Sequence, residues 1–199
     1  MLNTQPTSPV TITVTSSDQS EGTVLPTSLS FTPGAGMNGW NTPHTVTVTG
    51  VDDDTNDGDV PYQITLSAAS GGDYTGVNPT PSVLNLSNID NDTPGLIVSS
   101  MMCSTTSSIS VPYLVTLRSE PAQAVTVNFS IVNPTDFEKG SISPLNVEFT
   151  SAKGNWALPQ TVTVSGGMTA GDYPIAATTS STDPDYAGLS WGVTCTNTP

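Results

Sequence analysis

Apolar and polar residues alternate along short stretches of this chain, and that pattern is typical of β-strands with one buried face. Threonine and valine supply most of the alternation, and no stretch keeps the 3.6-residue period of an amphipathic helix. Turn-forming residues separate the stretches at short spacing. We therefore predict an all-β chain of antiparallel sandwiches, with strands at 10–16, 28–31, 45–51, 62–67, 83–86, 96–102, 110–117, 125–131, 146–149, 161–165, 175–179 and 189–194.

The same motifs occur twice along the chain, at a spacing of about 115 residues. PHTVTVTG at 43–50 returns as PQTVTVSG at 159–166, and DYTG at 73–76 returns as DYAG at 185–188. Self-similarity of this kind indicates tandem modules, and 199 residues suffice for two domains of about 100 residues each. We predict domains at 1–94 and 95–199.

The first copy has no counterpart of residues 95–116. Leu2 and Pro6 of the first copy match Leu117 and Pro121 of the second. The first sandwich should therefore lack its first strand and most of its second, which exposes a sheet edge and a strip of core. Three interpretations stay open. The sequence begins within a repeat, a strand from another molecule completes the sheet, or residues 1–9 rearrange to cover the gap.

The chain is strongly acidic, with 17 Asp and Glu residues against three Lys and Arg and a net charge of -14. This charge disfavours nucleic acid and anionic membranes as partners. It suits a divalent cation, or it simply keeps the protein soluble. No apolar run reaches the roughly 18 residues of a membrane-spanning helix, so we expect no membrane insertion. Threonine-rich strands and scarce lysine favour an extracellular or cell-surface location.

Nine carboxylates of the first copy fall in loops that should lie at one end of its sandwich, because neighbouring antiparallel strands alternate in direction. Calcium takes six to eight oxygen ligands, and carboxylate-rich loops can supply them. We predict a Ca²⁺ site at this end, facing the second copy. The alternative is that Asp is simply common in hairpin loops. The candidate ligands are Asp18, Glu21, Asp52, Asp53, Asp54, Asp57, Asp59, Asp90 and Asp92.

The order of motifs resembles a known family. It runs EG, LPTSLSFTP, GWNTPHTVTVTGVDDDTNDGD, GDYTG and NIDNDTPG. This order is similar to the Calx-beta repeats of large bacterial surface proteins and to the calcium-binding modules of sodium–calcium exchangers. The resemblance implies immunoglobulin-like sandwiches with calcium at one end. The second copy keeps GNWALPQTVTVSG but has lost most of the matching acids at 167–172 and 196–199, so we expect calcium in the first copy only.

Both cysteines, Cys103 and Cys195, lie in the second copy. The first and last strands of immunoglobulin-like sandwiches run side by side. The resemblance therefore implies a disulfide between these two residues. Two buried free thiols are the alternative.

Nothing in the sequence indicates catalysis. The one histidine, His44, sits where the second copy has Gln160, and no nucleophile motif is present. We expect a non-catalytic structural or adhesive module, stiffened by calcium between its copies, with neighbouring repeats of the same protein as partners. A module that binds glycans or proteins at the cell surface is one alternative. A self-associating subunit of an extracellular filament, completed by strand exchange, is another.

Overall fold

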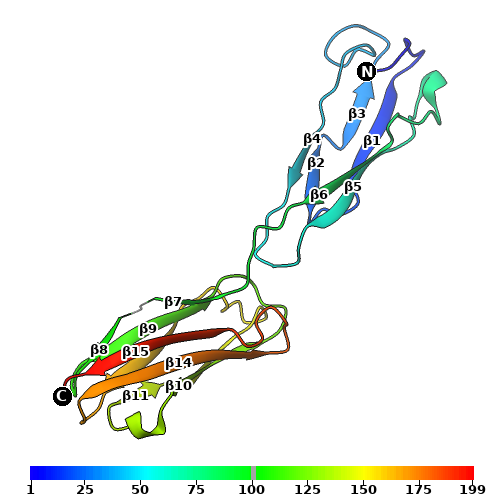
Figure 1. Cartoon of the computed structure of the whole chain (residues 1–199). Coiled ribbons are helices and arrows are strands. Elements are labelled where there is room, and N and C mark those ends of the chain that lie inside the picture. Colours follow the sequence, from blue (N-terminus) through cyan, green and yellow to red (C-terminus); the bar gives the residue numbers. More distant parts are fainter. Residues whose placement is uncertain (100–101) are drawn as a thin grey trace. The chain divides into compact units, whose positions relative to one another are not determined.

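The computed structural model describes residues 1–99 and 102–199, and they form a nearly all-β structure with two compact units (Figure 1). Unit 1 comprises Met1–Asp53 and Asp57–Asp90, and unit 2 comprises Asp54–Asn56 and Asn91–Pro199. The predicted all-β class with antiparallel sheets is confirmed. Among the described residues, no helix is long and apolar enough to cross a membrane.

Unit 1 contains two antiparallel sheets. One has the strand order β3-β1-β5-β6 and the other pairs β2 with β4. A short 3₁₀ turn, Gly72–Tyr74, follows β5. The strands are β1 (Val10–Ser16), β2 (Gly22–Leu25), β3 (Ser28–Phe31), β4 (Thr47–Gly50), β5 (Val60–Leu66) and β6 (Val83–Asn88).

Unit 2 repeats this arrangement with additional strands. Its sheets have the orders β12-β10-β14-β15-β8 and β11-β13-β9-β7. A 3₁₀ turn, Pro134–Asp136, follows β10. The strands are β7 (Leu96–Val98), β8 (Cys103–Thr105), β9 (Ser110–Leu117), β10 (Val125–Ile131), β11 (Gly140–Ser143), β12 (Asn146–Phe149), β13 (Gln160–Gly166), β14 (Gly171–Ser181) and β15 (Ser190–Asn197).

The alternation in the sequence decides which face of each strand is buried. Every second residue of β1 points into the core of unit 1, and the same holds for β10 in unit 2. Burying one such Val or Ile side chain contributes about 1.5–3 kcal/mol. The core of unit 2 joins residues of both its sheets, such as Val127 of β10 and Val162 of β13, which makes the unit a sandwich.

The two units share one strand plan. The order β3-β1-β5-β6 matches β12-β10-β14-β15, and β2-β4 matches β11-β13. Even a close contact recurs: Gly22 lies against the ring of Tyr62, and Gly140 lies against the ring of Tyr173. A β-carbon at either glycine would overlap the tyrosine ring.

Unit 1 has no counterpart of β7, β8 or β9 within the described part of the chain. In unit 2, β13 lies between β11 and β9, whereas β4 of unit 1 pairs with β2 alone. The missing strands therefore leave one edge of β4 open. This explains why β4 begins at Thr47, although a strand was predicted from residue 45.

Other strand limits also differ from the prediction. The strand predicted at 96–102 is observed as β7, Leu96–Val98; its residues 100–101 lie outside the described residues. Three short strands, β2, β8 and β11, were not predicted. β14 spans 11 residues rather than the five predicted, since it pairs with β10 on one side and β15 on the other.

Candidate functional site

Three of the predicted ligands meet in unit 1. Glu21 precedes β2, and Asp53 and Asp57 lie in the loop between β4 and β5. Carboxylate oxygens of these three residues, the acidic triad, lie within 4.8 Å of one another. Glu21 is only 8% exposed, while both aspartates are exposed. Close carboxylates repel one another, and a divalent cation relieves that repulsion.

The last residue of β6 holds this region in place. The Asn88 side chain donates to the Val51 carbonyl at 2.5 Å and to Glu21 Oε2 at 3.4 Å. Asn197, at the end of β15, likewise donates to the carbonyls of Gly167 and Thr169, both at 2.9 Å. In each unit, the asparagine that ends the last strand thus holds a loop: the loop after β4 in unit 1 and the loop after β13 in unit 2.

Unit 2 places a lysine where unit 1 places Glu21. Lys139 precedes Gly140 as Glu21 precedes Gly22. The Lys139 ammonium lies 2.7 Å from Asp136 and donates to the carbonyl of Asp172 at 3.0 Å. Its hydrogen bond to Asp136 lowers the pKa of that carboxyl. At this end of the sandwich, unit 2 therefore carries the Lys139 ammonium, whereas unit 1 carries a cluster of carboxylates.

Three other predicted ligands accept hydrogen bonds from nearby backbone amides instead: Asp18, Asp59 and Asp90. Asp18 accepts hydrogen bonds from the hydroxyl and amide of Ser20, and these bonds lower its pKa. Asp59 accepts from the Asp90 amide at 3.1 Å, and Asp90 accepts from the Gly58 amide at 2.8 Å. These carboxylates therefore stabilise turns at the end of unit 1.

The remaining predicted ligands are not in the triad. Asp52 is exposed, and Asp54 and Asp92 belong to unit 2. Asp183 of unit 2 is 4% exposed and accepts hydrogen bonds from the amides of Ala122 and Asp185. Its role is to hold a loop.

Cys103 and Cys195 form the predicted disulfide. Cys103 lies on β8 and Cys195 on β15, and these strands are parallel neighbours with the two cysteines directly opposite. Their α-carbons are 4.4 Å apart. The bond ties the edge strand β8 to the sheet of unit 2.

Two tyrosines anchor equivalent segments of the two units. The Tyr74 hydroxyl accepts from the Thr4 amide at 2.9 Å and donates to the Thr4 carbonyl at 3.0 Å. The Tyr186 hydroxyl makes the same two bonds to Ser119, at 3.1 and 2.6 Å. The sequence repeat paired the tyrosines. Their partners could not be read from it because they lie about 70 residues away.

The backbone just before these anchored residues matches as well. The Leu2 amide donates to the Trp40 carbonyl at 2.7 Å, and the Leu117 amide donates to the Trp156 carbonyl at 3.1 Å. Leu2 is 8% exposed and Leu117 is 2% exposed. Leu2 and Leu117 therefore occupy equivalent places in the two units, as the sequence match predicts. The start of unit 1 lies where the end of β9 lies in unit 2.

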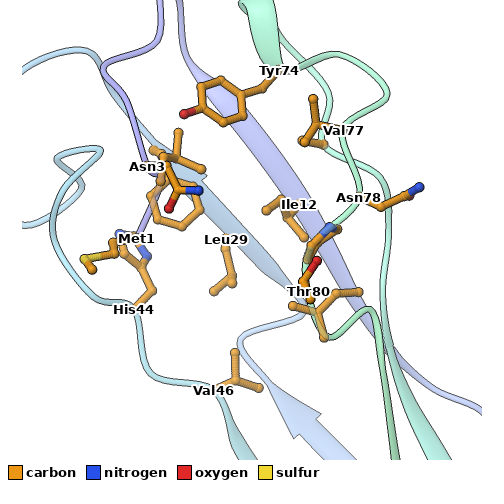
Figure 2. A pocket seen from close by; sticks show the side chains of 15 residues that line it. Met1, Asn3, Ile12, Leu29, His44, Val46, Tyr74, Val77, Asn78 and Thr80 are labelled. Carbon is orange, nitrogen blue, oxygen red and sulfur yellow. The ribbon is translucent and has the colours of Figure 1, made fainter.

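A groove of about 440 Å³ opens in unit 1 beside this segment (Figure 2). Ile12 of β1 and Leu29 of β3 face into it, and Met1, His44 and Val46 line one side. The His44 ring lies 4.5 Å from that of Phe31, centroid to centroid. Its Nε2 is buried, and no described residue forms a hydrogen bond with it.

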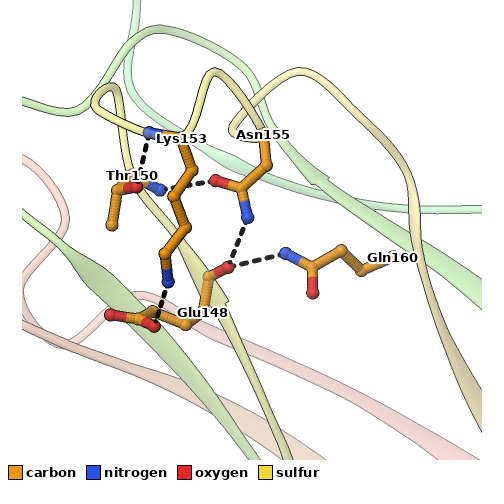
Figure 3. A network of polar contacts seen from close by, with 5 residues as sticks. All are labelled: Glu148, Thr150, Lys153, Asn155 and Gln160. Atoms are coloured by element: carbon orange, nitrogen blue, oxygen red, sulfur yellow. Dashed lines mark hydrogen bonds and ion pairs between the residues drawn. The ribbon is translucent and has the colours of Figure 1, made fainter.

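The equivalent of His44 in unit 2, Gln160, has a hydrogen-bond partner. Gln160 donates to the Glu148 carbonyl at 2.7 Å, and Asn155 donates to the same oxygen at 2.9 Å (Figure 3). Lys153 pairs with the Glu148 carboxylate at 2.7 Å and closes the network. The unpaired nitrogen is thus a feature of unit 1.

The sequence matches no family model, and no curated protein is similar enough to count as a match. Among solved structures, the chain is similar to the periplasmic chaperone SfaE at 10% identity and a TM-score of 0.42, over 53% of this chain and 57% of that chain. It is also similar to SSP-19, an MSP-domain protein like family member of Caenorhabditis elegans (10% identity, TM-score 0.36, 49% and 94% covered). A third similar structure is that of E. coli alpha-2-macroglobulin, at 14% identity and a TM-score of 0.37, over 78% of this chain and 9% of that chain. The sheets described above, rather than these distant likenesses, show the β-sandwich fold.

Proposed function

We propose that this chain is a non-catalytic structural module of a secreted or cell-surface protein, and that unit 1 binds Ca²⁺ through Glu21, Asp53 and Asp57. The approach of these three carboxylates to within 4.8 Å carries the proposal. Backbone carbonyls and water would supply the remaining oxygen ligands that calcium needs. At the equivalent position of unit 2, Lys139 balances the charge of the Asp136 carboxylate, and a bound cation would do the same for the triad of unit 1.

The proposed role of calcium is to stiffen the tandem. The loop between β4 and β5 gives Asp53 and Asp57 to the triad. An ion bound by this loop would restrict it, and neighbouring repeats of a parent protein would then be held more firmly. The resemblance to Calx-beta repeats agrees with this role. The disulfide favours an oxidising, extracellular compartment.

Thermal unfolding with and without calcium tests the proposal. Calcium at 100 times its dissociation constant should stabilise unit 1 by about 2.7 kcal/mol, and chelator should reverse this. Unit 2 should not respond. Glu21→Gln should raise the melting temperature of unit 1 in chelator, because it removes repulsion, and should abolish most of the calcium response.

Asp52→Asn is the matched control, since Asp52 is an exposed acid of the same loop outside the triad. This variant should keep the calcium response of the unmodified chain. The proposal fails if calcium leaves the melting temperature of unit 1 unchanged. It also fails if Glu21→Gln and Asp52→Asn respond alike.

A further inference from the structure

A hollow of about 620 Å³ opens in unit 1 between β1 and β2. All the residues that line it lie between positions 13 and 28, and their equivalents in unit 2 lie between positions 128 and 146. In the sheet β11-β13-β9-β7, β13 separates β11 from β9, so the equivalent side of β2 does not border the place of β9. The hollow is therefore built only from segments that both units possess.

One core side chain of unit 2 has no equivalent in the wall of this hollow. β1 and β10 begin at Val10 and Val125, which take the same register against the neighbouring strand, so Ser16 corresponds to Ile131. Ile131 is 7% exposed and belongs to the core of unit 2, whereas Ser16 lines the hollow. The residue opposite this position on the next strand is isoleucine in both units, so no larger neighbour replaces the lost volume.

Another exchange on the same strand is balanced. Val14 replaces Phe129, but Leu66 lies opposite Val14 where Ala177 lies opposite Phe129. A core that keeps its total volume tolerates such a swap. The change at Ser16 has no such balance, and a core side chain that is lost without compensation leaves a cavity.

β2 carries two further exchanges at the hollow. Val24 stands where unit 2 has Ile142, which makes the wall of the hollow smaller again. Leu25 stands where unit 2 has Ser143, and it lines the hollow although it is 69% exposed. Unit 1 thus has less apolar volume inside and an exposed apolar side chain at the rim. This combination is typical of a ligand site, and the volume lies within the usual range of about 300–1,000 Å³.

The lining is apolar at its floor and uncharged throughout. Val14 and Val24, which are 0% and 8% exposed, form the floor. The side chains of Gln19 and Thr27 are exposed and form no hydrogen bond with another described residue, so both can bind a polar group of a ligand. A charged ligand would be buried here without a partner, which is costly.

We propose that this hollow binds a small, uncharged aromatic molecule that carries a hydroxyl group. β1 and β2 belong to opposite sheets of unit 1, and the backbones of packed sheets lie about 10 Å apart. A slot of this width takes one layer of side chains, or a flat ring in their place. The ring lies between Val14 and Val24, in the space that the Ile131 side chain takes in unit 2, and the hydroxyl bonds to Gln19 or Thr27. Apolar cavities left by a missing core side chain bind benzene in this way.

The probe is benzyl alcohol, titrated into the full chain in chelator and followed through the NMR shifts of backbone amides. We expect saturable shifts at residues 13–28 and none in unit 2. Ser16→Ile should weaken binding at least about tenfold, because it restores the side chain that takes this space in unit 2. Thr11→Ile is the matched control and should bind as the unmodified chain does, since Thr11 is an exposed residue of β1 outside the hollow.

A second variant covers the case in which Ser16→Ile disturbs the adjoining turn. The Ser16 hydroxyl donates to the Asp18 carbonyl at 2.7 Å, and Ser16→Ile removes that bond. Val24→Ile fills part of the hollow without removing a hydrogen bond, and it should also weaken binding. Two other probes test the chemistry of the ligand. Benzylammonium should bind at least about tenfold more weakly than benzyl alcohol because of its charge, and cyclohexylmethanol should bind more weakly because its ring is not flat.

Three results would overturn the inference. The first is the absence of saturable shifts at residues 13–28. The second is binding that neither Ser16→Ile nor Val24→Ile weakens more than Thr11→Ile does. The third is binding of benzylammonium or cyclohexylmethanol as tight as that of benzyl alcohol, which would assign the shifts to the acidic surface or to a non-specific apolar contact. Every titration is made in chelator, so its outcome does not depend on the calcium proposal.

Discussion

Breaking the disulfide should destabilise unit 2 and leave unit 1 unchanged. The bond joins residues 92 positions apart, and both belong to unit 2. Closing a loop of this length lowers the entropy of the unfolded chain by an amount worth about 4.6 kcal/mol at 25 °C. Measured effects usually fall below this ceiling, at about 2–4 kcal/mol.

Reduction of the unmodified chain is the cleanest perturbation, because it removes one covalent bond and leaves every side chain in the core. For a unit of this size, about 2–4 kcal/mol corresponds to a fall in melting temperature of roughly 10–20 °C. Calorimetry with and without reductant would resolve the two transitions. The variant Trp40→Phe keeps tryptophan only in unit 2, so its fluorescence identifies which transition belongs to that unit.

Unit 1 has no cysteine and serves as the internal control. The reasoning is refuted if mass spectrometry shows two free thiols while the transition of unit 2 stays within about 1 kcal/mol of its oxidised position. It is also refuted if both transitions fall together. Hydrogen exchange should further show that β8 loses protection first, since only three residue pairs hold it to β15.

Two further predictions concern other contacts in unit 2. Tyr186→Phe should cost about 1–3 kcal/mol in urea unfolding, because it leaves the amide and carbonyl of Ser119 unpaired in a buried site. Asp136 has a folded pKa below its unfolded value of about 3.9, chiefly through the hydrogen bond from Lys139 and then that from Asn133. Its contribution is therefore present at neutral pH and is lost as the pH falls through the unfolded value towards the folded pKa. Asp136→Asn should destabilise the unit at pH 7, and the difference from the unmodified chain should shrink by pH 3; a constant difference would contradict this assignment.

The limit of local sequence is clearest at the repeated strand. PHTVTVTG and PQTVTVSG are nearly the same, yet the first yields the four-residue β4 and the second yields the seven-residue β13. Propensity and alternation do not distinguish them. The difference comes from β9, which pairs with the second edge of β13 and has no equivalent beside β4 among the described residues.

The acidic loops show the same limit for the site. From the direction of the strands, the sequence predicts nine carboxylates at one end of the first sandwich. Which of them meet depends on side-chain contacts. The carboxylates of Glu21, Asp53 and Asp57 converge. The Asp59 carboxylate instead accepts from the Asp90 amide, and the Asp90 carboxylate accepts from the Gly58 amide. Spacing along the chain could not separate these two outcomes.

The sequence by itself determined the β-sandwich class, the buried face of each long strand and the match between the two copies. These features follow from local alternation and from self-similarity, which can be read without knowing any distance. Only the tertiary structure decided the composition of the acidic triad and the existence of a groove beside His44. Both depend on residues far apart in the chain, and on a strand position that is filled in unit 2 and open in unit 1.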